Sequence, residues 1–480
     1  MPLANGIPPG STKREWIQRA ALFCVFFLSV MSTCAQQLAP HSIHLANGKT
    51  LELKLPSNFT IGVAAQGLKR VRFMAKSPDS RIFVTDMHDL ADNSLGKVYI
   101  LDGWNEKTGT FAKITPYLEH LRNPNNLAFW TDPVKKQSWL YLPLTDKLVR
   151  YKYNAGDNAP SSPPETVMRF PDYGLSYKYG GWHLTRTVAV AESHGATRIF
   201  IAAGSSCNYC QEREVLRAAV VSMDPDGKNP SLAAQGIRNA VDLHSVPSLN
   251  SALFATNMGD DHLGDQLPED TFFQLDLTSN TTPNYGWPTC YFAHGKPAHD
   301  TTPLPKLDAA GEIAAAPAST NSAEDSVYGK QTGVVAAGVN LAAGGGHAGP
   351  DPNAALGQAP EPLSSCEKVP PAYTTFAAHS SPLGFEYFGQ DDPILHNSFL
   401  VALHGASHPH IGTGYRVVRF SPSDRKPHDF ITGFLTVVHG KPVVHGRPCG
   451  ILRTGPDSFL LTDDYLGLIY SIYPRAKPAN

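Results

Sequence analysis

The chain has 480 residues, with 40 basic and 42 acidic side chains and a formal net charge of −2. It contains no basic block, which argues against a nucleic-acid partner, because such proteins normally carry a positive stripe. The length accommodates two or three ordinary domains or one large all-β domain.

Residues 1–35 predict a cleavable export signal. Basic residues precede an apolar run at 20–30 (AALFCVFFLSV), and Thr33 and Ala35 are small residues suited to a cleavage site. The apolar run is too short to span a bilayer comfortably, and a lipoprotein would need Cys34, which Thr33 makes a poor acylation site. We therefore expect cleavage after Ala35, periplasmic or secreted localisation, and no stable membrane insertion.

A two-strand unit recurs through most of the remaining chain. Each copy is an apolar strand, a polar turn and a second strand with an aliphatic or aromatic pattern. Most copies begin about 54 to 60 residues after the previous one, but the interval from 252 to 398 is much wider. The six copies begin at Arg81 (RIFVTD), Trp139 (WLYLPLTD), Arg198 (RIFIAAGSS), Ala252 (ALFATNMGDD), Ser398 (SFLVALHG) and Ser458 (SFLLTDDYLG).

This pattern predicts an all-β fold, a six-bladed β-propeller over residues 36–480. The strands have period two, turn residues separate them, and no helical periodicity is sustained. Each unit is too small to bury its own faces, and no linker separates units as in an array of sandwich domains. The strand Phe59–Ala65 is expected to complete the last blade and close the ring. Residues 300–365, rich in Ala, Gly, Pro and Asn, predict a long low-complexity loop inserted in the propeller.

Five cysteines remain after removal of the signal, and an oxidising compartment favours pairing among them. Cys207 and Cys210 form CNYC, for which we favour a local disulfide over a redox pair or half of a zinc site, since no second CxxC follows. Cys290 and Cys366 are a plausible second bridge across the ends of the insertion. Cys449 is left over.

Several polar clusters fall just before or after predicted strands, where a propeller gathers loops at one end of its channel. Taken singly, each has a structural explanation, such as a satisfied turn or a solvated loop. Together they suit a small polyanion and a polyhydroxy substrate. The clusters hold His183 and Arg186 (GGWHLTR), Arg238, Asn239 and His244 (GIRNAVDLHS), Asp260, Asp261 and Asp265 (NMGDDHLGD), His379 (AHSSPLG), His404 and His408 (LHGASHPH) and Arg447 (HGRPCG).

The acidic segment MGDDHLGDQLPED has two interpretations. Carboxylates and turn carbonyls close together suit Ca²⁺, a hard cation with oxygen ligands, although the spacing is not that of an EF-hand. A charged loop capped by its own Asp side chains explains the segment equally well.

From about Phe59 to Tyr473 the chain resembles the glucose/sorbosone dehydrogenases, with the sorbosone-dehydrogenase-like branch the most similar. The family comprises exported six-bladed propellers that use pyrroloquinoline quinone (PQQ) and calcium. The resemblance is carried, in the family's order, by RVRFMAKSPDSRIFVTD, HLTRTVAV, GSSCNYCQE, GIRNAV, DDHLGDQLPED, NYGWPTCYF, AHSSPLGFEYF, LHGAS…GYRVVRF, HGRPCG and LLTDDYLGLIY.

The resemblance implies a PQQ-dependent oxidation of a sugar or a sugar-derived alcohol or aldehyde, with electrons passed to an external quinone or cytochrome. His183 would be the base that takes a hydroxyl proton, and Arg238 with Asn239 would lie beside the quinone oxygens. Ca²⁺ and Arg238 would stabilise charge on the quinone oxygen. The residues implied for the cofactor and the metal are Arg238, Asn239, His404 and Arg447 for PQQ, and the backbone oxygens of Gly259 and Asp260 for Ca²⁺.

The chain also departs from the family pattern. Where relatives commonly carry Arg or Lys, it has HGASHPHIGTG, and His408 and His410 supply no permanent charge. Met258 replaces a more polar residue in the predicted calcium loop. These departures motivate one alternative, a non-catalytic propeller that binds sugars or a protein partner. Another, a calcium-dependent lactonase-like hydrolase, needs more carboxylate and Asn ligands than the sequence offers.

Overall fold

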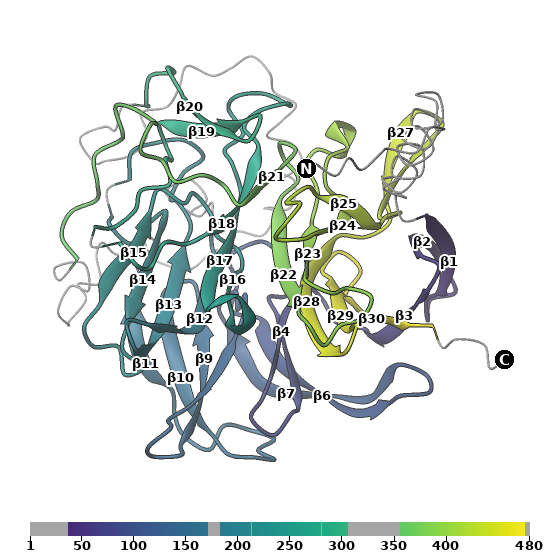
Figure 1. Ribbon diagram of the computed structural model, residues 1–480. Helices are drawn as coiled ribbons and strands as arrows, with labels where there is room; N and C mark the ends of the chain where they lie inside the picture. The colour runs from purple at the N-terminus through teal and green to yellow at the C-terminus, as the bar shows by residue number, and fades with distance from the viewer. Residues whose placement is uncertain (1–36, 171–182, 213, 280, 306–355, 476–480) are drawn as a thin grey trace, which may run out of the picture.

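The computed structural model describes residues 37–170, 183–212, 214–279, 281–305 and 356–475, and six four-stranded antiparallel sheets form a closed ring (Figure 1). The predicted six-bladed propeller is confirmed. The predicted signal at 1–35 and most of the predicted insertion lie outside the described residues. Within the described part of the chain, no helix is long and apolar enough to cross a bilayer.

The first three blades follow one another along the chain, each running from an inner to an outer strand. They are β4 (Val71–Lys76), β5 (Ile82–Asp86), β6 (Gly96–Asn105) and β7 (Thr110–Leu121); β8 (Ala128–Thr131), β9 (Ser138–Pro143), β10 (Lys147–Tyr153) and β11 (Glu165–Arg169); and β12 (Arg186–Ser193), β13 (Ala196–Ala203), β14 (Ala219–Met223) and β15 (Ser231–Gln235).

The last three blades include an insertion and the ring closure. They are β16 (Leu243–Val246), β17 (Ala252–Asn257), β18 (Asp270–Gln274) and β21 (Thr374–Phe376); β22 (Pro382–Phe388), β23 (Ser398–Leu403), β24 (Arg416–Phe420) and β25 (His428–Ile431); and β28 (Pro448–Gly455), β29 (Ser458–Asp463), β30 (Leu468–Pro474) and β3 (Phe59–Gln66).

The sequence repeat corresponds to the second and third strands of the blades. Each of the six copies begins at or next to the second strand, namely β5, β9, β13, β17, β23 or β29. The wide interval before the fifth copy arises because a long insertion separates β18 from β21 within the fourth blade. The repeat was therefore a correct guide to blade number.

Strand β3 closes the ring, as predicted from Phe59–Ala65. It pairs antiparallel with β30, with Phe59 opposite Pro474 and Gln66 opposite Leu468. A strand from the beginning of the propeller thus becomes the outer strand of its last blade, and this pairing ties the two ends of the ring together.

Apolar side chains fill the spaces between blades. Between the fourth and fifth blades, Phe272 packs edge-on against Phe385, with ring centroids 4.8 Å apart, and against Phe399 at 5.3 Å. All three rings are buried. Such contacts join each sheet to its neighbour and bury apolar faces that a single four-stranded sheet would leave exposed.

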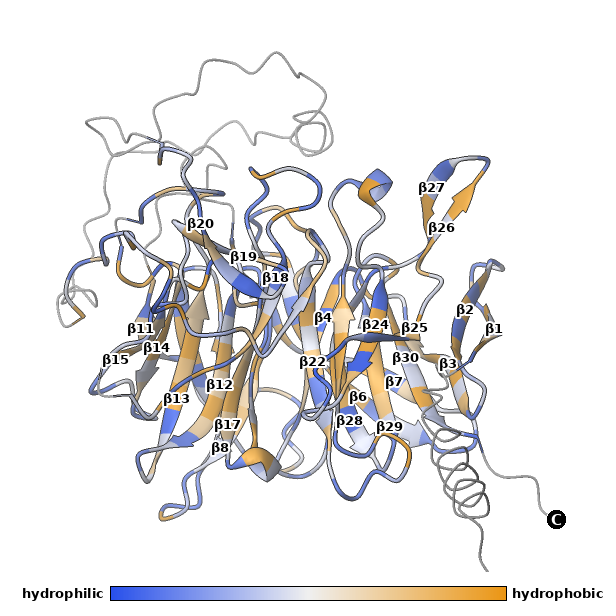
Figure 2. Cartoon of the chain, turned by 45° about the horizontal axis from the view of Figure 1, so that its top comes forward, coloured by the Kyte–Doolittle hydropathy of each residue, from blue (hydrophilic) through white to orange (hydrophobic). Residues whose placement is uncertain are grey.

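Within the described ranges, three hairpins and two 3₁₀ turns accompany the blades. The hairpins are β1–β2 (Leu38–His44, Thr50–Pro56), β19–β20 (Cys290–Ala293, Lys296–His299) and β26–β27 (Leu435–Val438, Lys441–Val444), and the turns are η2 (Pro247–Leu249) and η3 (Pro409–Ile411). The hairpins β19–β20 and β26–β27 stand toward the top of Figure 2.

Both predicted disulfides are confirmed. Cys207 bonds to Cys210, and Cys290, at the start of β19, bonds to Cys366. Cys449 is a buried free thiol, and burial raises its pKa to about 12.

Antiparallel pairing brings the start of each inner strand beside the end of the second strand. Arg186 pairs with Ala203, and Pro448 pairs with Asp463. Loops that precede an inner strand and loops that follow a second strand therefore meet at the same end of the channel. Most residues of the polar clusters in the sequence lie in these two kinds of loop.

Candidate active site at one end of the channel

His183 lies three residues before β12, with its ring fixed by the loop that follows β13. Its Nδ1 is 2.9 Å from the Ser205 carbonyl oxygen and 3.0 Å from the Ser205 hydroxyl, which itself donates to the Cys207 carbonyl at 2.6 Å. A carbonyl only accepts, so Nδ1 carries the proton and Nε2 carries the lone pair. Burial, and then the charge of Arg238, hold the pKa of His183 well below 6.5, so the ring is a neutral base.

Arg186 bonds to the backbone at His183 and not to the imidazole ring. Its Nη1 donates to the His183 carbonyl at 2.6 Å and to the Thr185 carbonyl at 2.8 Å, and its guanidinium lies over the Phe170 ring. The side chain is buried. Arg186 therefore fixes the backbone just before β12.

Arg238 is a buried guanidinium held by carbonyl and amide oxygens. Its Nε donates to the Asn208 carbonyl at 2.9 Å, its Nη2 to Asn208 Oδ1 at 2.7 Å, and its Nη1 to the Gly259 carbonyl at 2.6 Å. Among the described residues, no carboxylate forms a salt bridge with it. Burial lowers its pKa, and the nearby Asp261 and Asp260 act on it only at longer range.

Asn239 and His183 both pack against Gly204, which has no side chain and so lets the two residues come close together. A Cβ at Gly204 would come within 2.5 Å of Asn239 Oδ1 and 2.6 Å of His183 Cβ. The Asn239 amide also contacts Met258, with Nδ2 3.5 Å from its sulfur. His183, Arg238 and Asn239, predicted from two separate segments, therefore occupy one corner of the channel mouth.

The opposite side of the mouth holds Arg447 and His404. Arg447 donates to the carbonyls of residues 405–406 at 2.9 and 3.0 Å and to the Tyr415 hydroxyl at 2.8 Å, and it stacks over the Tyr415 ring. His404 Nε2 lies 2.8 Å from Asp464 Oδ1. Burial lowers the pKa of His404 to about 4, so this residue is neutral and donates through Nε2–H.

Asp464, Arg70 and Arg72 complete this side and were missed by sequence reasoning. Asp464 Oδ2 accepts from Arg72 at 2.8 Å and from Arg70 at 3.2 Å, and the carboxylate is fully buried. Burial alone would raise its pKa, but His404 and the two arginines hold the pKa well below its usual range. The second Asp of TDD in the sixth repeat, and the two arginines of KRVRF, were the available signals.

Hydrogen bonds join the two sides of the mouth into a closed circuit. The Gly259 and Ser381 amides donate to the two oxygens of Asp270, both at 2.7 Å. The His404 amide donates to the Ser381 carbonyl, and the His404 side chain contacts Asp464. Arg72 bonds to both Asp464 and Asn125. Asn125 Nδ2 then donates to the Val241 carbonyl, and the backbone between residues 241 and 239 closes the circuit.

The acidic loop after β17 forms two His–Asp clusters. His379 contacts Asp261 Oδ1 at 3.0 Å and the Gly264 carbonyl at 2.9 Å, and its bond to Asp261 raises the pKa of His379 to about 9. His262 lies between two carboxylates. Its Nε2 is 2.6 Å from Asp300 Oδ2, and its Nδ1 is 2.7 Å from Asp260 Oδ1 but out of line for a hydrogen bond.

Four residues of the predicted clusters lie apart from this circuit. His244 is on β16, 3.9 Å from Glu386 and tilted against the Phe385 ring. Asp265 is exposed. His408 and His410 lie at η3 with ring centroids 5.8 Å apart.

The mouth suits an anionic ligand on its Arg447 side. Arg70 and Arg72 share one carboxylate, Asp464, whereas Asp463 accepts from the backbone amide of Arg447, and burial raises the pKa of Asp463 to about 7. Arg72 is buried and Arg70 and Arg447 are partly buried, and an excess of positive charge in such surroundings is costly unless a ligand compensates it. The carboxylates of PQQ are such a ligand, so these residues fit that group.

The Gly259 carbonyl does not fit a calcium ion as it is placed. It already accepts from the guanidinium of Arg238, so a cation bound there would lie beside a positive charge. Among the described residues, the one cluster of three possible metal-ligating side chains is Cys207, Cys210 and Glu212. The two cysteine sulfurs of this cluster are bonded to each other in the disulfide. The metal role of Gly259 and Asp260 stays a prediction.

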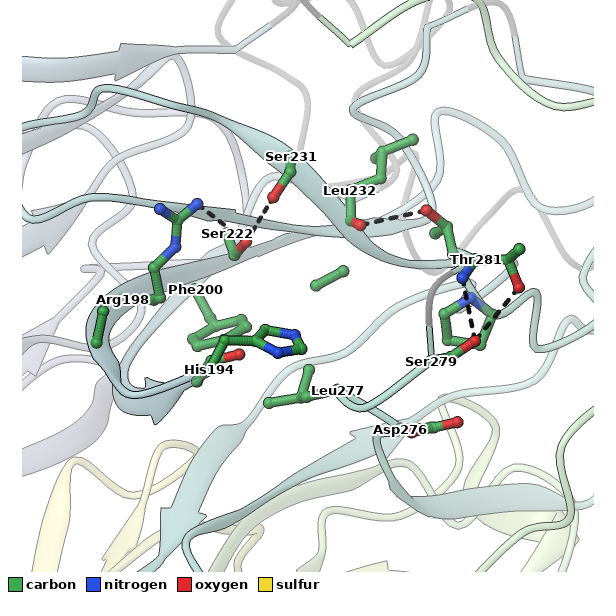
Figure 3. Close-up of a pocket in the computed structure, with 15 residues that line it drawn as sticks. His194, Arg198, Phe200, Ser222, Ser231, Leu232, Asp276, Leu277, Ser279 and Thr281 are labelled. Carbon is green, nitrogen blue, oxygen red and sulfur yellow. Dashed lines mark hydrogen bonds between the residues drawn. The ribbon is translucent and has the colours of Figure 1, made fainter.

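A separate cavity of about 360 Å³ lies between the outer parts of the third and fourth blades, near the β12–β13 turn (Figure 3). Its polar side chains largely bond to one another or to nearby backbone. Ser222 and Ser231 are 2.9 Å apart, and Thr282 donates to the Leu232 carbonyl at 3.3 Å. None of the predicted site residues lines it.

No protein-family model and no curated protein matches the chain, but solved structures share its fold. The calcium structure of Trichoderma reesei carbohydrate-active enzymes family AA12 has a TM-score of 0.57 at 16% identity, covering 92% of this chain and 100% of that one. The holo form of the pyranose dehydrogenase PQQ domain from Coprinopsis cinerea has a TM-score of 0.56 at 14% identity, covering 88% of this chain and 97% of that one. Similarity at this level of identity establishes the fold.

Proposed function

We propose that the chain is a PQQ-dependent oxidoreductase of the glucose/sorbosone dehydrogenase type that oxidises a sugar or a sugar-derived alcohol or aldehyde. The observation that carries the proposal is that a neutral base, His183, lies beside the Arg238 guanidinium at a channel mouth whose other side has excess positive charge. Among the described residues, no carboxylate forms a salt bridge with Arg238. The fold shared with a PQQ domain of a pyranose dehydrogenase supports it.

The chain's own residues divide the chemistry among them. When bound, PQQ would supply the acceptor for the hydride. His183 takes the substrate hydroxyl proton at Nε2, and the Ser205 carbonyl stabilises the imidazolium through Nδ1–H. Arg238 stabilises negative charge that develops next to it, at a buried place where water screens little.

Arg447 and Arg70 would bind the carboxylates of the cofactor. Arg70 is partly exposed, with 20% of its side-chain surface accessible, and bonds to Asp464 through Nη1 alone. His404, being neutral, would act through hydrogen bonding rather than charge. It orients Asp464, which in turn fixes Arg72. No step is assigned to a metal, because Arg238 occupies the Gly259 carbonyl.

Reconstitution of the full chain tests the proposal. Purified protein would be mixed with PQQ, with and without CaCl₂, and dye reduction followed with aldoses, polyols and sorbosone. We expect saturable PQQ binding and dye reduction with at least one sugar. Absence of PQQ binding together with absence of dye reduction would contradict the proposal and favour a non-catalytic binding propeller.

We also propose periplasmic or secreted localisation with an external quinone or cytochrome as electron acceptor. The predicted signal and the two disulfides support export, because such bonds persist in oxidising compartments. N-terminal sequencing of the protein recovered from outside the cytoplasm should begin at Gln36. Recovery of only unprocessed cytoplasmic protein would contradict this localisation.

A further inference from the structure

The disulfide loop Cys207–Cys210 lies inside the candidate site. It follows β13, at the same channel end as His183, and both of its sulfur-bearing residues are buried. The bond joins residues three apart in sequence, so it fixes the two residues between them, Asn208 and Tyr209. A bond this local constrains local geometry more than overall folding, since its closed loop is short.

Asn208 supplies both of its oxygens to neighbouring segments. Its carbonyl and its Oδ1 accept from Nε and Nη2 of Arg238 at 2.9 and 2.7 Å, and Oδ1 also accepts from the Asp261 amide at 3.0 Å. Two parallel bonds to one guanidinium set its plane as well as its position. Asn208 thereby links Arg238 to the acidic loop after β17.

The two residues on either side of Asn208 connect the loop to the rest of the site. The Cys207 carbonyl accepts from the Ser205 hydroxyl, the group that contacts His183 Nδ1. The Tyr209 ring stacks on His262 with centroids 3.8 Å apart. Displacement of this short loop would thus disturb the base, the guanidinium and the acidic loop together.

We propose that Asn208 is a positioning residue for Arg238 and that the Cys207–Cys210 bond holds Asn208 in place. The inference rests on the proposed function for its catalytic consequence. Arg238 has no carboxylate salt bridge among the described residues, so the oxygens of Asn208 and Gly259 are what orient it. A charge that must stabilise a transition state loses its effect when it is displaced by about 1 Å.

The position of Arg238 can be measured without cofactor through His183. The charged groups that act on the imidazole are Arg238 and Arg217, which lower its pKa, and Asp261, which raises it. If Arg238 moves away, the pKa of His183 rises toward 6.5. The chain has 19 histidines, so the His183 resonance is assigned by its loss in His183→Ala.

The test uses NMR titration of the apoprotein with two uncharged changes, Asn208→Leu and the double variant Cys207→Ser/Cys210→Ser. We expect both to raise the pKa of His183 by about half a unit or more. Removal of the other bridge, Cys290→Ser/Cys366→Ser, is the matched control and should leave that pKa unchanged. An unchanged His183 pKa in both test variants overturns the proposal, and the cysteine variant decides alone if Asn208→Leu does not fold.

The reconstituted enzyme gives a second readout. Asn208→Leu should lower kcat on the order of 10- to 100-fold with a smaller effect on KM. Asn208→Gln, which keeps an uncharged amide acceptor for Arg238, should retain more of kcat than Asn208→Leu, and equal losses in the two variants would contradict the proposal. If no variant or wild type oxidises a sugar but the titration shifts appear, the proposed function fails while the positioning role stands.

Discussion

The Nδ1 atom of His183 lies 2.9 Å from the carbonyl oxygen of Ser205. This contact decides the tautomer of the ring and directs its lone pair, on Nε2, away from the protein atom that fixes it. An imidazole held in this way is ready to accept a proton without a change of tautomer. Its partner is a carbonyl and a hydroxyl instead of a carboxylate, so no adjacent negative charge raises its basicity through Nδ1.

His183→Ala should leave PQQ affinity within about twofold of wild type and lower turnover on the order of 10²-fold or more, because the base is lost and no charge is removed. Cofactor titration and dye-reduction kinetics measure the two quantities. His194→Ala, at the far end of β12, is the matched control. Wild-type turnover in His183→Ala would exclude this residue as the base.

The pH dependence of kcat/KM should be flat from about pH 8 to below pH 6.5, because burial and Arg238 hold the pKa of His183 well below that value. A lowered pKa keeps the neutral base in the majority as the pH falls, so activity declines only once the medium is more acidic than the lowered pKa. Arg238→Met removes one of the charges responsible, and the residual activity should show its acid limb at higher pH. An acid limb that is already at pH 7 in the wild type would contradict this assignment.

Arg447→Met should weaken PQQ binding by about 10- to 100-fold, the loss expected for charge-assisted hydrogen bonds to a carboxylate. Arg447→Lys keeps the charge but loses the planar fork, so an intermediate affinity is expected. Arg416→Met, which removes an exposed arginine paired with Asp429, controls for a general effect of lost charge. Equal affinities in all three variants would show that the cofactor does not contact Arg447.

The fold was largely predictable because the signals that specify it are local. Period-two strands ending in Thr-Asp or Thr-Asn mark the second strand of several blades, and the Thr85 and Thr462 hydroxyls there bond to backbone carbonyls of the next blade. The closing strand at Phe59 and both disulfides were also predicted correctly.

The site was only partly predictable, because its partners come from different blades. His183, Arg238, Asn239, His404 and Arg447 were found through their motifs, and the structure brings all five to one channel end. The roles of Asn208 and Asp464 depend on side-chain contacts between distant segments, which no local pattern encodes. The charge of His404 depends on burial, which the sequence likewise does not specify.

Calcium should bind the apoprotein only weakly. Arg238 donates to the Gly259 carbonyl at 2.6 Å, so a cation must displace or approach a guanidinium to reach that oxygen. Calorimetric titration of the apoprotein with CaCl₂ should show no tight site, whereas Arg238→Met should bind more tightly. Tight binding to the wild-type apoprotein that Asp260→Asn abolishes would instead establish the acidic loop as a metal site.

The two disulfides should differ in how much each contributes to stability and to the geometry of the site. Cys290 and Cys366 are 76 residues apart, so their bond closes a long loop, and the loop-closure entropy predicts a loss of about 4.5 kcal/mol in the free energy of unfolding when both become serine. Cys207 and Cys210 are three residues apart, and the same relation gives about 2 kcal/mol. Urea unfolding monitored by tryptophan fluorescence measures both losses. The Cys290→Ser/Cys366→Ser variant should be the less stable of the two proteins. It should nevertheless keep the wild-type pKa of His183, because the bond that it lacks lies in the insertion and does not touch Arg238. A larger loss of stability in the Cys207→Ser/Cys210→Ser variant would contradict this division of roles.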